Sequence, residues 1–195
     1  MKFYILNSWE NAYASFVPQK KDHDMFEYLK HLPALENYTP IEMVRHDCPK
    51  PRRQGGDLVN TEPPIVSQRF KDTMGEILTG KGVFYPVITD GEAQNYWIFK
   101  IENCIDAIDF DRSTGAINRW QPENKFSTLH SFFMQENLNL EVDPIIFSTP
   151  QFPYNFVTDG FVEKVKLNKL TGIYLYKEGD VREYKNRIFL NKNIK

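Results

Sequence analysis

Apolar residues recur at helical spacing over residues 66–80, which gives the clearest pattern in the chain. They stand at i, i+4, i+8, i+11 and i+12 and are Val66, Phe70, Met74, Ile77 and Leu78. Side chains at this spacing share one face of an α-helix. Ser67 is a suitable N-cap, since its side-chain oxygen can accept a hydrogen bond from the first turn. Gly80 and Gly82 predict the end of this helix.

A second helix is predicted over residues 158–170. Its apolar stripe consists of Phe161, Val162 and Val165. Thr158 can act as the N-cap, and Gly172 is expected to terminate the helix. The pattern also allows a short third helix within residues 26–35.

Short apolar and aromatic runs predict β-strands around these helices. Residues 83–88 and 95–101 form the strongest pair, because an Asp-Gly turn typical of hairpins joins them. Pro86 predicts an edge position or a bulge, since proline cannot donate to a strand ladder. Further strands are expected at residues 2–6, 41–45, 105–110, 129–134, 145–147 and 173–176. Strands without regular helix alternation indicate an α+β fold, a mostly antiparallel mixed sheet with two or three helices packed on it.

A segment rich in proline and glycine divides the sequence. Residues 47–64 contain four prolines and a Gly-Gly pair. This density is typical of a loop or linker. We therefore predict an N-terminal subdomain over residues 1–60 and an α+β domain over residues 61–195.

The composition indicates a folded protein in water. The 195 residues are 41% hydrophobic and 26% charged, and the net charge is −2. No run approaches the roughly 20 apolar residues of a membrane span. The apolar run at the start is too short for a secretion signal. We expect a cytoplasmic protein with no membrane partner.

The charges are unevenly distributed. Residues 87–143 carry ten acidic and four basic residues, whereas residues 160–195 carry four acidic and nine basic ones. These segments can pair within the fold or form separate surfaces. A small basic cluster stands at Lys50, Arg52 and Arg53, but phosphate binding needs a sustained basic surface. We expect no nucleic-acid partner.

Asp106, Asp109 and Asp111 are the best candidates for chemistry. On an extended strand, Asp109 and Asp111 would face the same side. Two carboxylates on one face can bind a hard cation or act as acid and base. The segment lacks the oxygen-rich loop of a calcium site, and turn residues follow it. The favoured interpretation is structural carboxylates, and the alternative is a metal-dependent enzyme that uses this face.

No other set of residues indicates a catalytic or cofactor site. The four histidines, at positions 23, 31, 46 and 130, are scattered and lack zinc-site spacing. A nucleophile elbow, a phosphate-binding loop and a dinucleotide fingerprint are all missing from the sequence. We expect no catalytic residue, no metal and no cofactor. This favours a protein that works by binding.

Three aromatic residues near the C-terminus are the candidates for partner contact. Phe152, Tyr154 and Phe156 follow Pro150 in a predicted loop. Aromatic loop residues commonly anchor protein interfaces. Glu92 and Asp111 are expected near the rim of such an interface, where acidic groups speed the encounter with a basic partner.

Several runs of the sequence together resemble one protein family. They are PPIVSQRFKDTMGEIL, VFYPV, NYWIFKI and CIDAIDFDRS, followed by VTD at residues 157–159 and TGI at residues 171–173. Over roughly residues 60–178, the chain resembles a bacterial immunity-protein family of polymorphic toxin systems. This is the MXAN-type immunity domain, formerly a domain of unknown function.

The resemblance implies a protein that is encoded beside a secreted toxin and protects the producing cell by binding that toxin without catalysis. The residues that it carries over are structural: Ser67, Arg69, Phe70, Asp106, Asp109, Thr158, Asp159 and Gly172. The alternatives are the metal-dependent enzyme above and a structural or sensor binding domain. The sequence names neither the toxin nor an oligomeric state.

Overall fold

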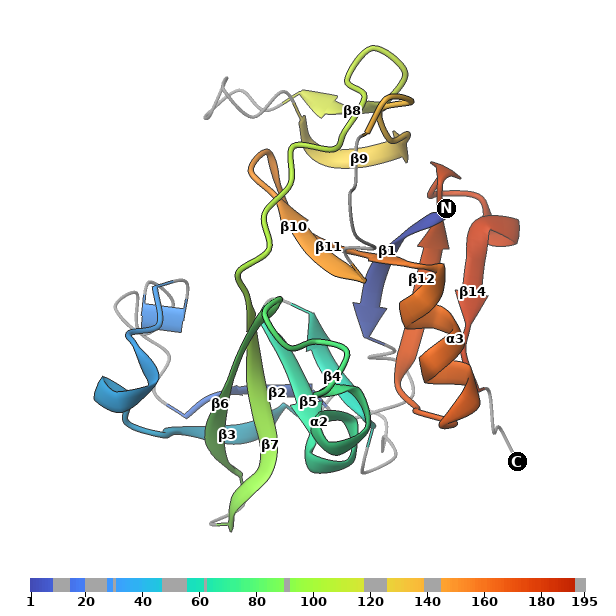
Figure 1. Ribbon diagram of the computed structural model, residues 1–195. Coiled ribbons are helices and arrows are strands. Elements are labelled where there is room, and N and C mark those ends of the chain that lie inside the picture. Colours follow the sequence, from blue (N-terminus) through green and yellow to red (C-terminus); the bar gives the residue numbers. More distant parts are fainter. Residues whose placement is uncertain are drawn as a thin grey trace.

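Three β-sheets make up most of the protein (Figure 1). The computed structural model describes residues 1–8, 15–19, 28–29, 31–46, 56–61, 63–89, 92–117, 126–138 and 145–191. The six-stranded sheet contains, in spatial order, β2 (Ser15–Pro18), β3 (Ile41–His46), β6 (Gly82–Thr89), β7 (Glu92–Ile101), β5 (Pro64–Ser67) and β4 (Leu58–Thr61).

The second and third sheets are built mainly from later residues. The five-stranded sheet contains β10 (Ile146–Thr149), β11 (Phe152–Thr158), β1 (Phe3–Ser8), β12 (Ile173–Lys177) and β14 (Arg187–Phe189). The three-stranded sheet contains β13 (Gly179–Asp180), β9 (Phe126–Phe132) and β8 (Thr114–Ile117). The helical elements whose bounds fall within the described residues are α2 (Gln68–Met74), α3 (Asp159–Leu167) and two 3-10 turns, η1 (Leu35–Asn37) and η2 (Tyr184–Asn186).

The sheets are mostly antiparallel. Among the described strand pairs, β3 and β6 are parallel, and Ile41 lies opposite Val87. With α2 and α3, this arrangement confirms the predicted α+β class, but the protein is richer in strands than one mixed sheet would be. The third helix expected within residues 26–35 lies partly outside the described residues.

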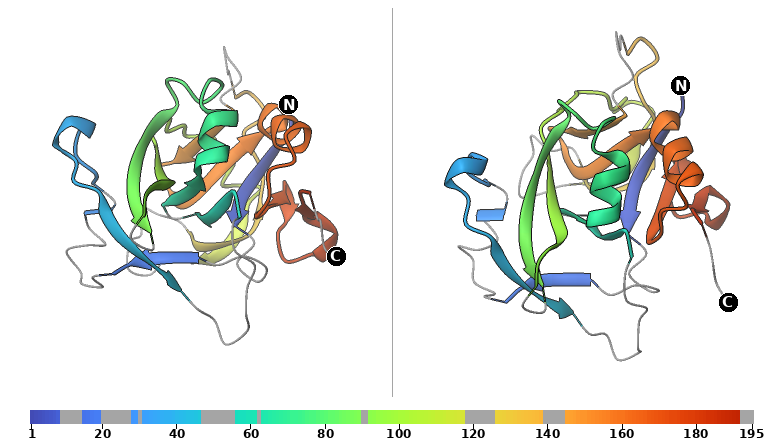
Figure 2. Two further views of the ribbon diagram at one scale, coloured as in Figure 1. Left: turned by 90° about the horizontal axis from the view of Figure 1, so that it is seen from below. Right: turned by 60° about the horizontal axis from the view of Figure 1, so that its bottom comes forward.

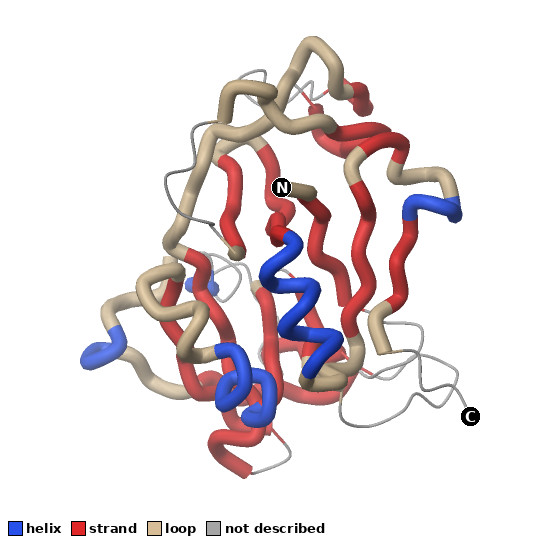
Figure 3. The backbone as a smooth tube through the Cα atoms, turned by 45° about the vertical axis from the view of Figure 1, so that its right-hand side comes forward, coloured by secondary structure: helices blue, strands red, loops and turns tan. Residues whose placement is uncertain are grey.

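The two larger sheets and both α-helices share one hydrophobic core. Leu6 of β1 and Phe99 of β7 belong to the same buried cluster, although they come from different sheets. Phe70 of α2 and Phe161 of α3 meet in this cluster with their ring centroids 6.2 Å apart. Figures 2 and 3 show the two helices side by side. The core therefore joins the two sheets through their helices.

β1 is buried on both faces, which explains the continuous apolar run at the start of the chain. Tyr4 and Leu6 point into the core shared by the two sheets. Phe3 and Ile5 point the other way, into a second core that the three-stranded sheet covers. Successive side chains of a strand alternate between its faces, so a central strand buried on both sides needs no polar position.

The predicted hairpin of β6 and β7 is confirmed, with a correction for Pro86. β6 lies between β3 and β7, so Pro86 is not on an edge strand. The register between β6 and β7 shifts between Val87 and Ile88, which confirms the alternative expectation of a bulge. The hydroxyl of Tyr38 donates a 3.0 Å hydrogen bond to the Pro86 carbonyl. This bond occupies the backbone where the pairing with β3 begins.

α2 begins where the sequence predicts but is shorter than expected. The Oγ of Ser67 accepts a 3.0 Å hydrogen bond from the N–H of Phe70, so Ser67 is the N-cap. Regular helix ends at Met74, and turns follow over residues 75–81. The Leu78 N–H still donates to the Met74 carbonyl at 3.0 Å. The predicted apolar face is therefore kept, and Phe70, Met74 and Leu78 are all buried.

α3 ends in a Schellman motif centred on Lys169, and not at Gly172 as predicted. Lys169 has a φ of 51°, in the left-handed region. The N–H of Leu170 donates to the Val165 carbonyl, and the N–H of Lys169 donates to the Lys166 carbonyl, both at 3.1 Å. These two bonds define the motif. The sequence did not predict this motif because a lysine occupies the position that glycine usually takes.

Gly172 has a different role from the predicted one. Its φ is +79°, and a Cβ on it would lie 2.5 Å from the carbonyl oxygen of Leu58 in β4. A side chain at this position would collide with backbone, so glycine is required by both conformation and space. Gly172 thus permits the close approach between the start of β12 and β4.

Residues 47–64 are only partly the loop that was expected. From residue 56 onward the segment is described, except for residue 62, and it contains β4 and the start of β5. β1 lies in the five-stranded sheet, whereas β2, β3 and β4 lie in the six-stranded one. The division at residue 60 stays a prediction, and a subdomain of residues 1–60 would share both sheets with the rest. No helix in the described parts is long and apolar enough to cross a membrane.

Candidate partner-binding surface

Asp57 is the centre of a polar network where the two larger sheets meet. Its side chain is 4% exposed and forms an ion pair with Arg69 Nη1 at 3.2 Å. Its Oδ1 accepts from the Ser67 hydroxyl at 2.7 Å. Its Oδ2 accepts from the N–H of Thr171 at 2.7 Å and from the Thr171 hydroxyl at 3.1 Å. A buried carboxylate needs both donors and a countercharge, and Asp57 has both.

Arg69 extends this network to the end of α3. Its Nη2 donates to the carbonyl of Asn168 at 2.6 Å and to that of Lys169 at 3.3 Å. The last carbonyls of a helix lack partners within the helix and carry its negative dipole end. A guanidinium is well suited to both features. The start of α2 is thereby fixed against the end of α3, and two of the runs that carried the family resemblance meet at Asp57.

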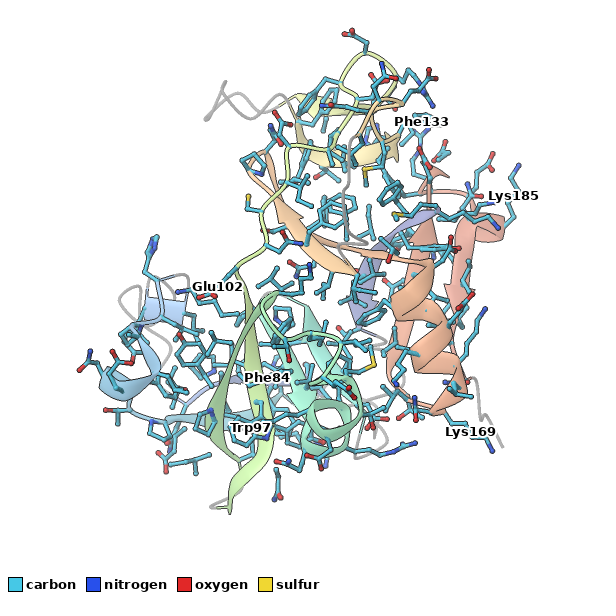
Figure 4. All side chains as sticks on the ribbon, viewed as in Figure 1. Phe84, Trp97, Glu102, Phe133, Lys169 and Lys185 are labelled. Atoms are coloured by element: carbon cyan, nitrogen blue, oxygen red, sulfur yellow. The ribbon has the colours of Figure 1, made fainter. Side chains whose placement is uncertain are left out.

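An open groove of about 680 Å³ lies beside α2, over β6 and β7. Its walls come from η1 and the residues after it, from α2 and the following turns, and from the hairpin, and they include Leu35, Tyr38, Lys71, Leu78, Phe84 and Trp97. Phe84 and Trp97 share one face of the hairpin, because Trp97 pairs with Pro86, two residues from Phe84. Figure 4 shows both side chains over this hairpin.

Lys71 and Trp97 form the polar contact in this apolar groove. The Nζ of Lys71 lies 3.1 Å from the centroid of the Trp97 ring. The indole N–H donates to the Oε1 of Gln68 at 2.7 Å, which fixes the ring. Burial of the ammonium lowers the pKa of Lys71, against the opposing effect of Asp72. The ring face attracts the cation, so Lys71 lies against the groove wall, partly shielded from water.

The groove wall that includes η1 is supported by the half-buried Tyr38 and the buried Tyr85. The ring of Tyr38 packs edge-on against Tyr85 with centroids 4.9 Å apart, and the Tyr85 hydroxyl donates to the Pro33 carbonyl at 2.8 Å. Burial raises the pKa of Tyr38 to about 12, so its hydroxyl remains a donor. Next to this rigid pair, Leu35 is 48% exposed. Leu35 is therefore an exposed apolar side chain at the groove rim, next to two packed tyrosines.

Phe152, Tyr154 and Phe156 lie in the strand β11 and not in a loop. Phe152 is 5% exposed and Phe156 is fully buried. Phe156 stacks on Phe147 with centroids 5.6 Å apart, and Tyr154 packs against the same core. Alternate residues of a strand share a face, and this face meets the three-stranded sheet. The expected exposure is wrong, and Phe152 and Phe156 are not available to a partner in this conformation.

Among the described residues, no contact supports a partner-binding role for the two acidic candidates, Glu92 and Asp111. Glu92 begins β7, and its side chain lies outside the described residues. Asp111 is exposed in a turn. Their role at an interface stays a prediction.

Asp106 and Asp109 make separate contacts, and residues 110–112 lie in a turn and not in the extended strand that was expected. Asp109 Oδ1 accepts from the N–H groups of Asp111 and Arg112 at 3.0 and 3.1 Å. This confirms the expected backbone hydrogen bonds, but the cation beside Asp109 is Arg112, at 3.7 Å, and not Arg69. Asp106 accepts from Gln151 at 2.9 Å. Across the described ranges, no three His, Cys, Asp or Glu residues gather as a metal site.

Asp159 connects α3 to the first residues of the chain. Its carboxylate accepts from the N–H of Lys2 at 2.8 Å and from the hydroxyl of Tyr4 at 3.1 Å. Burial, followed by the hydrogen bond to Asp159, raises the pKa of Tyr4 to about 12. Thr158 is the N-cap through its backbone, without a side-chain capping hydrogen bond. The acidic group in the first turn complements the positive end of the helix dipole.

The sequence predicted neither the buried role of Asp57 nor the groove. Asp57 stands in the proline- and glycine-rich segment, where an aspartate is typical of a turn. Lys71 lies on the polar side of the predicted helix, where a solvated lysine is the ordinary interpretation. The only local sign was the aromatic content of the NYWIFKI run, which gave a strand but not a surface.

The comparison with known families covers the region that contains the Asp57 network and the groove. The model of the Immunity protein family (Imm11) matches residues 15–180. The chain belongs to this family. The resemblance to immunity proteins is thereby confirmed, and the matched region begins at β2 and not near residue 60. It includes Asp57, both α-helices and the groove. Among curated proteins, no match was found.

Proposed function

We propose that this protein binds and neutralises a cognate bacterial toxin of a polymorphic toxin system, without catalysis, in the cytoplasm of the producing cell. The family match over residues 15–180 carries the proposal. The groove supports it, because binding energy in protein interfaces is concentrated on aromatic and apolar anchors in pockets. The exposed Leu35 offers such an anchor at the groove rim.

Binding alone can protect a cell if the complex is long-lived. A stable inhibitory interface covers about 800 Å² on each partner. The groove would form one part of it, and the acidic stretch over residues 87–143 would guide the approach of a basic toxin surface. Guidance of this kind mainly raises the association rate, whereas the buried anchors set the dissociation rate.

The test is co-expression with the toxin encoded beside this gene. We expect cells that carry both genes to grow and cells that carry the toxin alone to die. An inactive toxin variant controls for the burden of expression. If the cells die equally fast with and without this protein, the proposal fails.

A titration separates binding from catalysis. We expect toxin activity to fall linearly with added protein and to vanish at one equivalent. An enzyme that modifies the toxin would inactivate many equivalents, given time. Continued loss of activity at one protein per ten toxin molecules would therefore contradict the proposal.

A further inference from the structure

Among the described residues that line the groove beside α2, one has a charged side chain. The other described residues that line it contribute apolar groups, backbone or the hydroxyls of Tyr38 and Thr79. Lys71 is the exception, and its Nζ lies over the Trp97 ring. Such a groove does not match a uniformly basic or a uniformly apolar partner surface. It matches an apolar segment with a single negative charge.

Lys71 lacks an acidic partner within the described part of the chain. Its ammonium meets the Trp97 ring, and the acidic group that acts on it is its neighbour Asp72. Asp72 is itself exposed and accepts a 2.7 Å hydrogen bond from Gln68. Partial burial already disfavours the charge of Lys71, as the lowered pKa indicates. A carboxylate placed in the groove beside Lys71 would stabilise its charged form and offset the effect of burial.

The apolar contribution comes from both walls. Leu35 projects from η1 with 48% of its surface exposed, and Phe84 and Trp97 form the floor with Pro86. Gly75 and Gly80 in the turns after α2, and Gly82 at the start of β6, also line the groove and add no side chain to it. A side chain seated between these walls would be surrounded by apolar groups, as hot-spot residues are.

We propose that this groove holds the toxin through a segment in which an aspartate or glutamate side chain lies beside a large apolar side chain. The carboxylate would pair with Lys71, and the apolar side chain would pack between Leu35 and Phe84. This inference rests on the proposed function and adds the contact surface and the chemistry of the partner segment.

The protein offers matched controls on another face. Leu167, at the end of α3, is 77% exposed, and Lys166 beside it is exposed too. Neither residue lines the groove. Leu35→Asp should therefore be compared with Leu167→Asp, and Lys71→Gln with Lys166→Gln. Thermal unfolding of each variant shows whether it is folded.

The measurement is the affinity of the full-length protein for an inactive form of the toxin encoded beside this gene. We expect Leu35→Asp to weaken binding at least about 10-fold. Lys71→Gln should weaken it about 30-fold or more, since a desolvated ion pair loses one partner. The two control variants should bind within about 3-fold of the unchanged protein.

A charge exchange tests the carboxylate directly. In this test, each Asp or Glu of the toxin is changed to Lys in turn, and each toxin variant is mixed with the Lys71→Glu protein. One toxin variant should bind the Lys71→Glu protein at least about 10-fold more tightly than the unchanged toxin binds it. Hydrogen exchange of the complex should protect residues 35–40 and 75–86. Protection confined to other segments would contradict the proposal that the toxin binds in the groove. This measurement uses the unchanged protein, so it remains decisive if a groove variant fails to fold.

The outcomes separate this inference from the proposed function. If the unchanged protein does not bind the toxin, the proposed function fails and the inference fails with it. If it binds, and both groove variants bind like their controls, only the groove is refuted. A dimer in light scattering that Leu35→Asp dissociates would identify a second copy as the occupant and would overturn the toxin assignment.

Discussion

The carboxylate of Asp57 accepts a 2.7 Å hydrogen bond from the backbone amide of Thr171, which lies 114 residues further along the chain. In the opposite direction, the N–H of Asp57 donates to the Thr171 carbonyl at 2.9 Å. The same carboxylate holds Ser67 and Arg69 at the start of α2. One buried acidic residue thus connects the six-stranded sheet to the end of α3 and the start of β12.

Replacing Asp57 with alanine should destabilise the protein by about 3 kcal/mol, the lower end for a broken buried ion pair. The substitution leaves the amide and hydroxyl of Thr171 without their acceptor. The destabilisation is limited because the Arg69 side chain is 53% exposed and can return to water. Urea unfolding measures the change. Asp106→Ala is the control at an exposed site, and equal effects of the two substitutions would refute the role of Asp57.

Two glycines with similar φ angles should respond differently to substitution by alanine. Gly80 has a φ of +73° and open space where a Cβ would lie, whereas Gly172 has a φ of +79° and a carbonyl oxygen 2.5 Å from that position. Gly80→Ala should cost about 1 kcal/mol, from backbone strain alone. Gly172→Ala should cost about 1–3 kcal/mol more, from crowding against Leu58. Equal losses in chemical denaturation would show that the close approach is unimportant.

Lys169→Gly should stabilise the protein by about 0.5–1 kcal/mol. Lys169 occupies the left-handed position of the Schellman motif, which glycine adopts without the steric penalty of a side chain. The backbone carbonyl that accepts from Arg69 is kept. The control is Lys166→Gly within regular helix, which should instead lose about 1 kcal/mol. A loss of stability at both positions would exclude this account of the helix end.

Phe70→Ala should cost about 3–5 kcal/mol, as expected for a buried aromatic ring. Phe70 is 1% exposed and contacts Phe161 in the core that the two sheets share. Leu167→Ala, at a residue that is 77% exposed, should change stability by less than about 0.5 kcal/mol. A loss below about 1 kcal/mol for Phe70→Ala would mean that α2 does not carry this core.

Stability should fall in alkali, and Tyr4 should contribute to the fall. The pKa of Tyr4 rises from 10.0 to about 12 on folding, so the folded protein holds this proton more tightly than the unfolded chain. The resulting stabilisation is complete below pH 10 and is lost as the pH rises towards 12. Tyr4→Phe removes the ionisable group and should make the decrease between pH 10 and 12 smaller. Unfolding curves with the same decrease in both proteins would contradict this assignment.

Local patterns in the sequence determined much of the fold. Ser67 predicted the start of α2, because an N-cap hydrogen bond needs only a neighbour three residues away. The hairpin of β6 and β7 followed from residue alternation and an Asp-Gly turn. The family followed from motifs that are likewise contiguous in the sequence.

Tertiary structure alone decided the remaining features, because they depend on residues that are distant in sequence. β11 was mistaken for a loop with exposed aromatics, since Pro150 and Pro153 resemble a turn and only the covering three-stranded sheet buries Phe156. Asp57 acquires its role from donors on both sides of a sheet junction. The groove combines side chains from η1, α2 and the hairpin. No short-range pattern encodes such a meeting, because it arises only when long-range packing brings these elements together.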